Sequence, residues 1–288
     1  MIIVKIIGGL GNQMFQYALG RNLANRNNME LKLDISDFKN YKWHTYGLNK
    51  LNIGENIATE KEIAKFKKYK TKSRSFLFFH NKFVADNSIY VHEGTFNFNS
   101  KILDIKKSVY LDGYWQSEKY LLGIEDIIRE EFTPRSPISP AAKTISEKMG
   151  GSSISFHIRR GNYVTDKKVA EALGSCSLDY YQGALLKATM NLNKPEIFAF
   201  SDDIGWVKKN IKTKHKITFV SEHKLEDWEE MVLMSKCRRH IISNSTFSWW
   251  GAWLDPRKDK MVIAPSMPWF KSQRLANNDI VPSSWIQM

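Results

Sequence analysis

The second half of the chain alternates short apolar runs with helix-length segments, and this alternation constrains the fold more than any other feature. Apolar runs predict strands at residues 152–158, 195–200, 216–220, 239–242 and 260–264. Helices are predicted near 140–149, 177–190, 203–211 and 226–237, the first ending at a glycine C-cap, Gly150-Gly151. Such alternation is typical of a parallel, doubly wound α/β sheet. The first four strands end in polar or charged residues, and open sheets bind ligands at that carboxyl edge.

The first half begins with the same kind of unit. An apolar strand at 2–7 leads into a glycine turn, a helix over 12–27 and a strand at 30–35, which together predict a βαβ unit. Later elements are predicted as a helix near 59–68, strands near 89–92 and 107–112, and a helix near 117–130. Pro134, Pro137 and Pro140 then cluster as expected of a linker. The chain of 288 residues is therefore predicted to form two domains, 1–135 and 136–288.

Charge and cysteine content narrow the classes of function. Lys and Arg outnumber Asp and Glu by 43 to 30, a net charge of +13 that favours an anionic partner: nucleic acid, a membrane surface or a phosphate-bearing substrate. We find no nucleic-acid-binding module and therefore predict no nucleic-acid partner. Eight Lys and Arg lie between Lys61 and Lys82, forming either a solvated face or a patch for anionic lipid head groups. Two cysteines, Cys176 and Cys237, cannot form a disulfide framework, which favours a reducing cytoplasm.

The glycine turn has two interpretations. Gly9 and Gly11, with Asp34 ending the next strand, imitate a dinucleotide-binding fingerprint, but Met14 stands where that fingerprint has its third glycine. Alternatively, the turn exposes backbone N–H groups, accompanied by three neutral hydrogen-bonding side chains, Asn12, Gln13 and Gln16.

Two later motifs are suited to phosphate. His157, Arg159 and Arg160 leave a buried strand together, and guanidinium groups donate paired, charge-assisted hydrogen bonds to phosphate oxygens. Ser243-Asn244-Ser245-Thr246, followed by Phe247-Ser248-Trp249-Trp250-Gly251, has the form of a helix N-terminus, where hydroxyl and free N–H groups attract anions. No Asp-x-Asp pair is present to hold a divalent metal, so these residues predict a diphosphate leaving group stabilised by arginine and helix dipole.

Three long motifs resemble glycosyltransferase family 11, the α-1,2-fucosyltransferases. They are Gly8-Gly9-Leu10-Gly11-Asn12-Gln13-Met14-Phe15-Gln16-Tyr17-Ala18, His157-Ile158-Arg159-Arg160-Gly161, and Ser243 to Ala252. Leu111 to Ser117 and Phe200 to Asp203 are also similar to family segments. The resemblance implies a GT-B-like fold of two Rossmann-like domains facing a cleft, GDP-fucose as donor substrate, and inversion at the anomeric carbon without a metal or other cofactor. The implied acceptor is a terminal galactose, fucosylated at O2.

The resemblance also implies roles for individual residues. Arg159 is expected to bind the donor diphosphate, with Arg160 assisting or bracing the loop, and His157 and Asp202 are expected to contact the guanosine. Ser245, Thr246 and Ser248 are expected at the diphosphate, with Asn162, Ser201, Asn244 and Phe247 also on the donor side. The cleft is expected to be lined by Gly9, Gly11, Asn12, Gln13, Gln16, Trp115 and Gln116. One departure stands out, because the family usually has Asp where this chain has Asn162.

The sequence therefore predicts an inverting, metal-independent α-1,2-fucosyltransferase, with an acceptor-side N-terminal domain and a donor-binding C-terminal domain. We expect a cytoplasmic enzyme, peripheral at the inner membrane face, that acts on a lipid-linked glycan acceptor. The alternatives are a related transferase that uses another nucleotide-activated sugar, and a non-catalytic nucleotide- or glycan-binding homologue.

Overall fold

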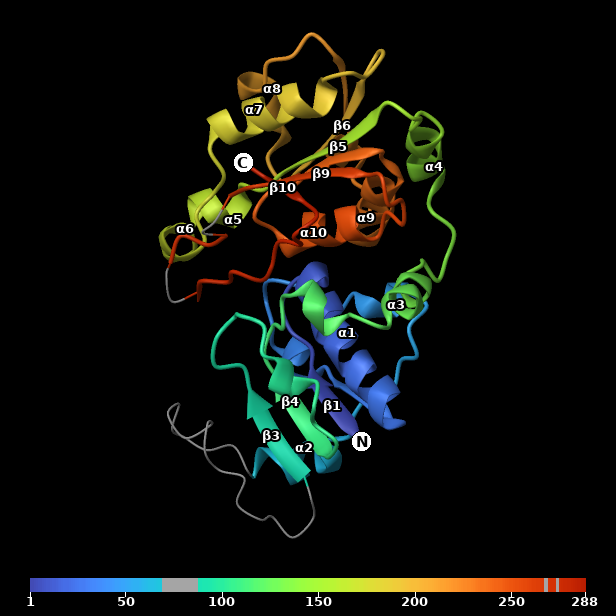
Figure 1. Ribbon diagram of the computed structural model, residues 1–288, viewed down its shortest axis with the longest axis vertical. Helices are drawn as coiled ribbons and strands as arrows, with labels where there is room; N and C mark the ends of the chain where they lie inside the picture. Colours follow the sequence, from blue (N-terminus) through green and yellow to red (C-terminus); the bar gives the residue numbers. More distant parts are fainter. Residues whose placement is uncertain (69–87, 267–268, 273–274) are drawn as a thin grey trace. The chain divides into compact units, whose positions relative to one another are not determined.

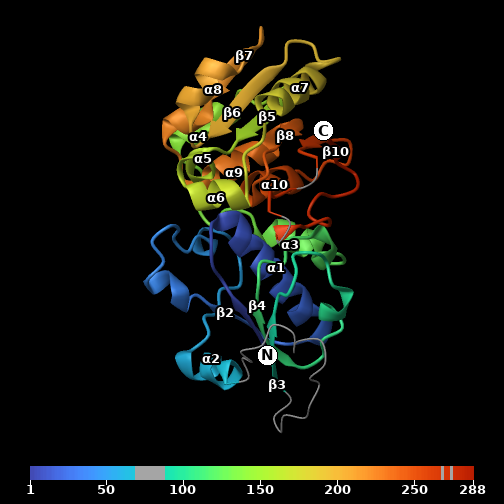
Figure 2. The ribbon, with the colours of Figure 1, turned by 90° about the vertical axis from the view of Figure 1, so that its left-hand side faces the viewer.

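The computed structural model describes residues 1–68, 88–266, 269–272 and 275–288. The chain divides into two compact units, Met1–Arg135 and Ser136–Met288, a boundary that coincides with the one expected from the proline cluster (Figures 1 and 2). Each unit contains a parallel sheet and several helices, so the α/β prediction is confirmed. Residues 69–82 of the basic segment lie outside the described residues, and its role in membrane contact stays a prediction. No helix in the described ranges is both long and apolar enough to cross a membrane.

The N-terminal unit is built on four parallel strands in the order β2-β1-β4-β3. They are β1 (Ile2–Lys5), β2 (Leu31–Asp34), β3 (Ser88–His92) and β4 (Ser108–Asp112), accompanied by helices α1 (Leu10–Asn27), α2 (Glu60–Lys67) and α3 (Glu125–Glu131). Ile63 and Phe66 of α2 pack against Ile3 and Tyr110 on one face of the sheet. Because α1 begins directly after the glycine turn that follows β1, the start of this helix lies at the carboxyl edge of the sheet.

The close approach of helix to strand occurs at Gly20. A Cβ at Gly20 would lie only 2.3 Å from Val4 Cγ2, so the glycine needed for tight packing of α1 comes later than a dinucleotide fingerprint would place it. Asp34, the ribose ligand of that interpretation, is 2% exposed and accepts hydrogen bonds from the Tyr110 hydroxyl (2.6 Å) and the Ser36 amide (3.0 Å). Burial alone would raise the pKa of Asp34, but these hydrogen bonds lower it. The dinucleotide interpretation is therefore wrong, because the close-packing glycine is Gly20 and because the carboxylate of Asp34 is buried within the unit.

Two predicted boundaries in the N-terminal unit differ from the structure. The helix over 12–27 begins at Leu10, because Gly9 is extended and serves as the N-cap. The single helix near 117–130 is wrong: a 3₁₀ turn at Glu118–Tyr120 is followed by Gly123 with φ at +90°, and α3 begins only at Glu125. A left-handed glycine interrupts a helix, which explains the break.

The C-terminal unit contains six parallel strands in the order β10-β9-β8-β5-β6-β7. They are β5 (Ser153–Ile158), β6 (Glu196–Ser201), β7 (Lys216–Phe219), β8 (Arg239–Ile241), β9 (Met261–Ala264) and β10 (Ile286–Gln287). The chain winds from β5 through β6 to β7 on one side, then returns to β8 beside β5 and continues outward to β10. The order of strands reverses between β5 and β8, and ligands of open α/β sheets bind at such a switch point.

Helices cover both faces of this sheet (Figure 1). Ile197 and Ala199 of β6 pack toward α7 (Leu178–Thr189) and α8 (Ile204–Asn210), while Phe198 and Phe200 pack toward α4 (Pro140–Ser146) and α9 (Asp227–Lys236). Successive strand residues point to opposite faces, so β6, which is buried on both sides, is apolar from Ile197 to Phe200. α10 (Thr246–Trp253) follows β8.

Several features of this unit were not anticipated. The short helices α5 (Gly161–Thr165) and α6 (Lys167–Ala172) and the strand β10 were not predicted. The predicted glycine C-cap at Gly150-Gly151 is wrong, because α4 ends at Ser146 and three-residue turns follow, with Lys148 and Met149 donating to the carbonyls of Ile145 and Ser146.

A buried polar chain also links the strands to the segment after α10. Ser155 Oγ lies 2.9 Å from His240 Nδ1, His240 Nε2 lies 3.0 Å from Asp255 Oδ2, and Arg257 Nε donates to Asp255 Oδ1 at 2.6 Å. The order resembles a hydrolase triad, but Ser155 is only 3% exposed and His240 and Asp255 are fully buried. The chain therefore satisfies buried polar groups rather than presenting a nucleophile to solvent.

Candidate active site

The two phosphate-type motifs meet at the switch point of the C-terminal sheet. His157 is near the end of β5 and Ser243 follows β8, and His157 Nδ1 lies 2.9 Å from Ser243 Oγ. The imidazole also packs against Phe247, with ring centroids 5.7 Å apart. Residues 86 positions apart in the sequence therefore build one site.

His157 is held in its neutral form. It is 6% exposed, and burial, with a further contribution from the Arg159 charge, lowers the pKa of His157 to about 3. A neutral imidazole carries one N–H donor and one acceptor nitrogen, so it can hydrogen-bond a polar ligand without adding charge.

Arg159 is oriented by three neighbours. Its Nη1 lies 3.1 Å from Asp202 Oδ2, its Nη2 donates to Asn162 Oδ1 at 2.9 Å, and the guanidinium lies 5.3 Å from the centre of the Tyr163 ring. The side chain remains 29% exposed. A guanidinium has five N–H donors, so these contacts fix its plane and leave donors for a ligand.

Asp202 connects the two arginines. Its Oδ1 accepts from the backbone N–H of Arg160 at 2.8 Å, while its Oδ2 pairs with Arg159. A Cβ at Gly161 would lie 2.3 Å from Asp202 Oδ2, so only glycine leaves room for the carboxylate here.

Arg160 has different partners from Arg159. Its Nε donates to Asp203 Oδ2 at 3.2 Å, and its guanidinium lies 4.1 Å from the centre of the Trp206 ring. Asp203 also caps α8 by accepting from the Trp206 amide. Arg160 therefore braces the loop against α8. Its side chain contacts Asp203 and Trp206, whereas the Arg159 side chain contacts Asp202 and Asn162.

The predicted residues after β8 divide between helix capping and loop anchoring. Ser245 is the N-cap of α10 and accepts from the Phe247 amide, while the Ser248 hydroxyl donates to the Ser245 carbonyl at 3.2 Å. Thr246, the first helical residue, is half-buried. Asn244 is 5% exposed, and its amide donates to the carbonyls of Leu173, Gly174 and Trp269. Ser201, 7% exposed, accepts from the Asp203 amide at 3.0 Å.

In the N-terminal unit, the side-chain amides of Gln13 and Gln16, which were predicted to line the cleft, form hydrogen bonds with nearby backbone groups. Gln13 is fully buried and donates to the carbonyls of Gly8 and Thr45, and its Oε1 accepts from the Gly47 amide. Gln16, also fully buried, accepts from the Ile7 amide at 2.9 Å.

The remaining predicted residues of that unit lie around the start of α1. Gln116 Nε2 donates to Asn12 Oδ1 at 3.0 Å, and Gln116 is 4% exposed. Trp115 is 2% exposed with φ at +56°. Gly9 caps α1 and Gly11 is buried in its first turn. Contact of these residues with a ligand stays a prediction.

In each unit, sequence reasoning missed residues that contact the predicted ones. Tyr163 and Trp206 stack on the two arginines, Asp203 pairs with Arg160, and Glu93 accepts hydrogen bonds from the amides of Tyr114 (2.6 Å) and Trp115 (3.0 Å). Burial raises the pKa of Glu93 to about 7. Only Asp203 could have been found from the sequence, because it directly follows the predicted site residue Asp202. No sequence pattern indicated that Tyr163 and Trp206 stack on the arginines.

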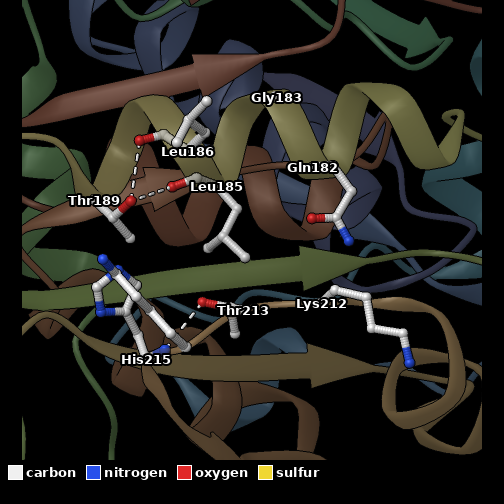
Figure 3. Close-up of a pocket in the computed structure, with 9 residues that line it drawn as sticks. Gln182, Gly183, Leu185, Leu186, Thr189, Lys212, Thr213 and His215 are labelled. Atoms are coloured by element: carbon white, nitrogen blue, oxygen red, sulfur yellow. Dashed lines mark hydrogen bonds between the residues drawn. The ribbon is translucent and has the colours of Figure 1, made fainter.

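A separate hollow in the C-terminal unit, of about 420 Å³, lies away from these residues (Figure 3). It is lined by the later part of α7 and by residues 212–215, which precede β7. These segments lie near the amino ends of β6 and β7, so the hollow is at the opposite edge of the sheet from Arg159.

The comparisons with known proteins agree with this architecture. All of the chain, residues 1–288, matches the family described as Glycosyl transferase family 11. The chain is 35% identical to an alpha-1,2-colitosyltransferase of Escherichia coli, covering 100% of this chain and 99% of the relative. It is 31% identical to the O-antigen biosynthesis glycosyltransferase WbnK of the same organism, covering 98% of both.

A solved structure shares the fold. NodZ alpha-1,6-fucosyltransferase soaked with GDP-fucose matches with a TM-score of 0.54 at 15% identity, over 94% of this chain and 96% of that one. Fucosyltransferase NodZ from Bradyrhizobium matches again at 0.54, with 14% identity over 88% of this chain and 93% of that one. Two parallel α/β units with this likeness define the GT-B fold. The match over the full length then places the chain, as its motifs had indicated, in glycosyl transferase family 11.

Proposed function

We propose that this protein is an inverting, metal-independent transferase that moves L-fucose from GDP-fucose to O2 of a terminal galactose-type acceptor in surface-glycan biosynthesis. The observation that carries the proposal is the placement of Arg159. Its guanidinium follows β5 at the switch point of the sheet and is fixed by Asp202 and Asn162. His157, two residues earlier, contacts Ser243 and Phe247 at the start of α10.

This arrangement suits the departure of a diphosphate. In an inverting transfer, the acceptor oxygen attacks the anomeric carbon from the face opposite the nucleotide, the bond from that carbon to the diphosphate oxygen breaks, and GDP leaves with the electron pair. The hydroxyl proton passes to a base. The charge that develops on the leaving oxygen is stabilised by preorganised donors, which here are the Arg159 guanidinium and the N–H groups at the start of α10. The neutral His157 contributes a hydrogen bond to the nucleoside side of the donor.

A second candidate is transfer of another nucleotide-activated 6-deoxy sugar. The relative at 35% identity carries the name of a colitosyltransferase, and colitose is L-fucose without its 3-hydroxyl group. A site that hydrogen-bonds that hydroxyl rejects the sugar that lacks it by a large factor, whereas a site that does not contact it accepts both. Comparing the rates of transfer from GDP-fucose and from GDP-colitose therefore distinguishes the two candidate functions.

The proposal includes the setting in which the reaction occurs. One relative is named for O-antigen biosynthesis, which supports a lipid-linked glycan acceptor and work at the cytoplasmic face of a membrane. The net charge of +13 is compatible with contact to anionic lipids.

The test is a donor panel of GDP-fucose, GDP-colitose and UDP-galactose, each with a β-galactoside acceptor, in the presence and absence of EDTA. We expect transfer from GDP-fucose that survives EDTA and gives an α-1,2 linkage by NMR. Preference for GDP-colitose selects the second candidate. GDP binding without transfer to any acceptor identifies a non-catalytic homologue, and an absolute requirement for Mg²⁺ or Mn²⁺ contradicts the leaving-group argument.

A further inference from the structure

The hollow beside α7 has walls that the protein holds in place (Figure 3). With its amide oriented so that both atoms are hydrogen-bonded, Gln182 donates to the Lys212 carbonyl at 3.0 Å and accepts from the Lys212 N–H at 2.8 Å. The Thr189 hydroxyl lies 2.9 and 3.0 Å from two carbonyls of the preceding turn of α7, and the Thr213 hydroxyl accepts from the His215 N–H at 3.1 Å. These polar groups are therefore engaged within the protein, and α7 is fastened to the segment before β7.

Aliphatic side chains are exposed around this hollow. Leu186, which lines it, is 70% exposed, and Met190, one turn later at the C-cap of α7, is 57% exposed. Met288 is 40% exposed and lies on the same helix surface, because a Cβ at Gly183 would be 3.5 Å from its Cε. These side chains contribute little to the free energy of folding, and a group of them on one surface indicates contact with an apolar partner.

Lysines surround the exposed aliphatic side chains. Five exposed lysines lie on α7, in the turn after it, at the end of α8 and before β7: Lys187, Lys194, Lys209, Lys212 and Lys214. Within the described ranges, none of the five forms an ion pair with a carboxylate, since Glu196 pairs with Lys216 (2.9 Å) and Glu222 with Lys208 (2.5 Å). The one acidic residue of α7, Asp179, is in its first turn, about two turns before Leu186. The surface is therefore both apolar and strongly cationic.

We propose that this surface docks on an anionic lipid bilayer. We call it the α7 edge and define it as Leu186, Met190, Met288 and the five lysines. Aliphatic side chains enter the boundary between head groups and acyl chains, while lysines extend along the surface and place their ammonium groups at the lipid phosphates. The inference rests on the proposed function only for its setting, a reaction at the cytoplasmic face of a membrane.

A bilayer suits the α7 edge better than the other polyanions that its charge could attract. Nucleic-acid binders hold bases on aromatic rings, whereas the exposed apolar side chains of the α7 edge are all aliphatic. Protein interfaces are enriched in aromatic residues and arginine and depleted in lysine, which is the opposite of this composition. Leucine and methionine among unpaired lysines match a surface that is anionic outside and apolar a few ångströms below.

The position of the α7 edge is also compatible with donor binding. The hollow lies near the amino ends of β6 and β7, whereas Arg159 follows the carboxyl end of β5 in the same sheet. A bilayer at the hollow therefore leaves the donor edge of this unit open to a nucleotide that arrives from solution.

The test is co-sedimentation of the full chain with two kinds of vesicle, phosphatidylcholine alone and equal parts of phosphatidylcholine and phosphatidylglycerol. We expect binding to the anionic vesicles only. Raising the salt from about 0.1 M to about 1 M should release the protein, because the Debye length falls from about 10 Å to about 3 Å.

Two double variants of equal charge locate the surface. Lys212→Gln/Lys214→Gln should weaken binding to anionic vesicles about 10-fold or more, since each lysine at such a surface contributes a factor of about 5. The matched control is Lys143→Gln/Lys148→Gln, which removes two exposed lysines on and after α4, a helix that packs on the other face of the same sheet. The control should change binding by less than about 3-fold. Equal losses in the two double variants would mean that only net charge matters, and would overturn the inference.

A third variant tests whether the partner has an apolar interior. Leu186→Ser should weaken vesicle binding about 5-fold or more, whereas Leu122→Ser, which alters a side chain 52% exposed in the other unit, should not. If loss of the lysines weakens binding and Leu186→Ser does not, the surface recognises a polyanion such as RNA or an acidic protein, and the bilayer is rejected. Exposed residues are replaced with little effect on folding, so loss of structure does not obscure these results.

The remaining outcomes also decide. The basic segment from Lys61 to Lys82 is intact in every variant, so binding through that segment would leave all affinities unchanged and overturn the inference. A wild-type chain that ignores anionic vesicles overturns it as well. Transfer from GDP-fucose to a soluble galactoside is measured on the same samples and does not use the vesicles. Vesicle binding as expected without any transfer supports the inference and rejects the proposed function, so the two failures are distinguishable.

Discussion

The substitution Gly161→Ala tests how Asp202 controls Arg159. Gly161 is the first residue of α5, and its φ is not in the left-handed region, so alanine is compatible with the backbone. The added methyl would lie 2.3 Å from Asp202 Oδ2, whereas ordinary contact begins at 3.4 Å. The carboxylate must therefore retreat by about 1 Å, although no hydrogen-bonding group has been removed.

The expected loss follows from the contacts that this retreat breaks. The ion pair of Arg159 Nη1 with Asp202 (3.1 Å) and the hydrogen bond from the Arg160 amide (2.8 Å) both depend on the position of that carboxylate. A hydrogen bond to a charged group contributes about 1.5–3 kcal/mol. If the diphosphate needs Arg159 in its present orientation, kcat falls by about 10- to 150-fold. Alanine favours a helix over glycine by about 0.5–1 kcal/mol, so the free energy of unfolding should change little.

The assay is steady-state transfer with calorimetric titration of GDP and urea unfolding. Gly151→Ala is the matched control, since a Cβ there meets nothing within 4 Å. A mutant cycle with Asp202→Ala completes the design: if the added methyl acts by displacing Asp202, then Asp202→Ala and the double variant lose activity equally. Transfer by Gly161→Ala within about twofold of wild type, with unchanged GDP affinity, refutes the reasoning.

Three further predictions concern the same site. Arg159→Lys should lower kcat by about 100-fold or more, because one ammonium cannot replace a planar guanidinium that contacts Asp202, Asn162 and Tyr163 together; near-normal steady-state turnover would assign the role to Arg160. Asn162→Asp should change turnover by less than about 10-fold, since a carboxylate oxygen can also accept from Arg159; if the natural form is silent and this variant active, that carboxylate is catalytic. The folded state keeps His157 neutral down to a pKa of about 3, whereas the unfolded chain protonates it near 6.5, so unfolding free energy should fall as pH drops below 6.5, by up to about 1.4 kcal/mol per pH unit. Urea unfolding of His157→Asn should lack this slope, and parallel profiles for the two forms would contradict the assignment.

The parts of the site that sequence reasoning could predict are those fixed by local pattern. A strand buried on both faces is largely apolar, so β6 was visible as an apolar run from Ile197 to Phe200, whereas β5 was visible as apolar residues that alternate with Ser153, Ser155 and His157. Polar residues at the ends of both strands marked the carboxyl edge. The helices α5 and α6 escaped because residues 161–172 contain no buried side chain and thus no apolar period to detect.

The contacts that the sequence could not predict depend on partners distant in sequence. Gln13 and Gln16 have the right groups to bind a ligand, and equally the right groups to satisfy buried backbone; only the fold shows that they do the second. The sequence left two roles open for Arg160, assisting Arg159 or bracing the loop. Its contacts with Asp203 and Trp206, more than 40 positions later, show the bracing.

The reversal of strand order between β5 and β8 has a consequence for the growing chain. Arg159 leaves the ribosome well before Ser243, and the imidazole of His157 gains its hydroxyl partner only after 86 further residues have been added. At synthesis rates of about 5–20 residues per second, the nascent chain therefore exists for several seconds with the β5 part of this sheet edge and without the β8 part. A ligand bound across that edge therefore recognises only the finished unit, and by mass action it favours completed over partial chains. Under the proposed function, the affinity for the nucleotide therefore depends on synthesis and folding of the whole C-terminal unit.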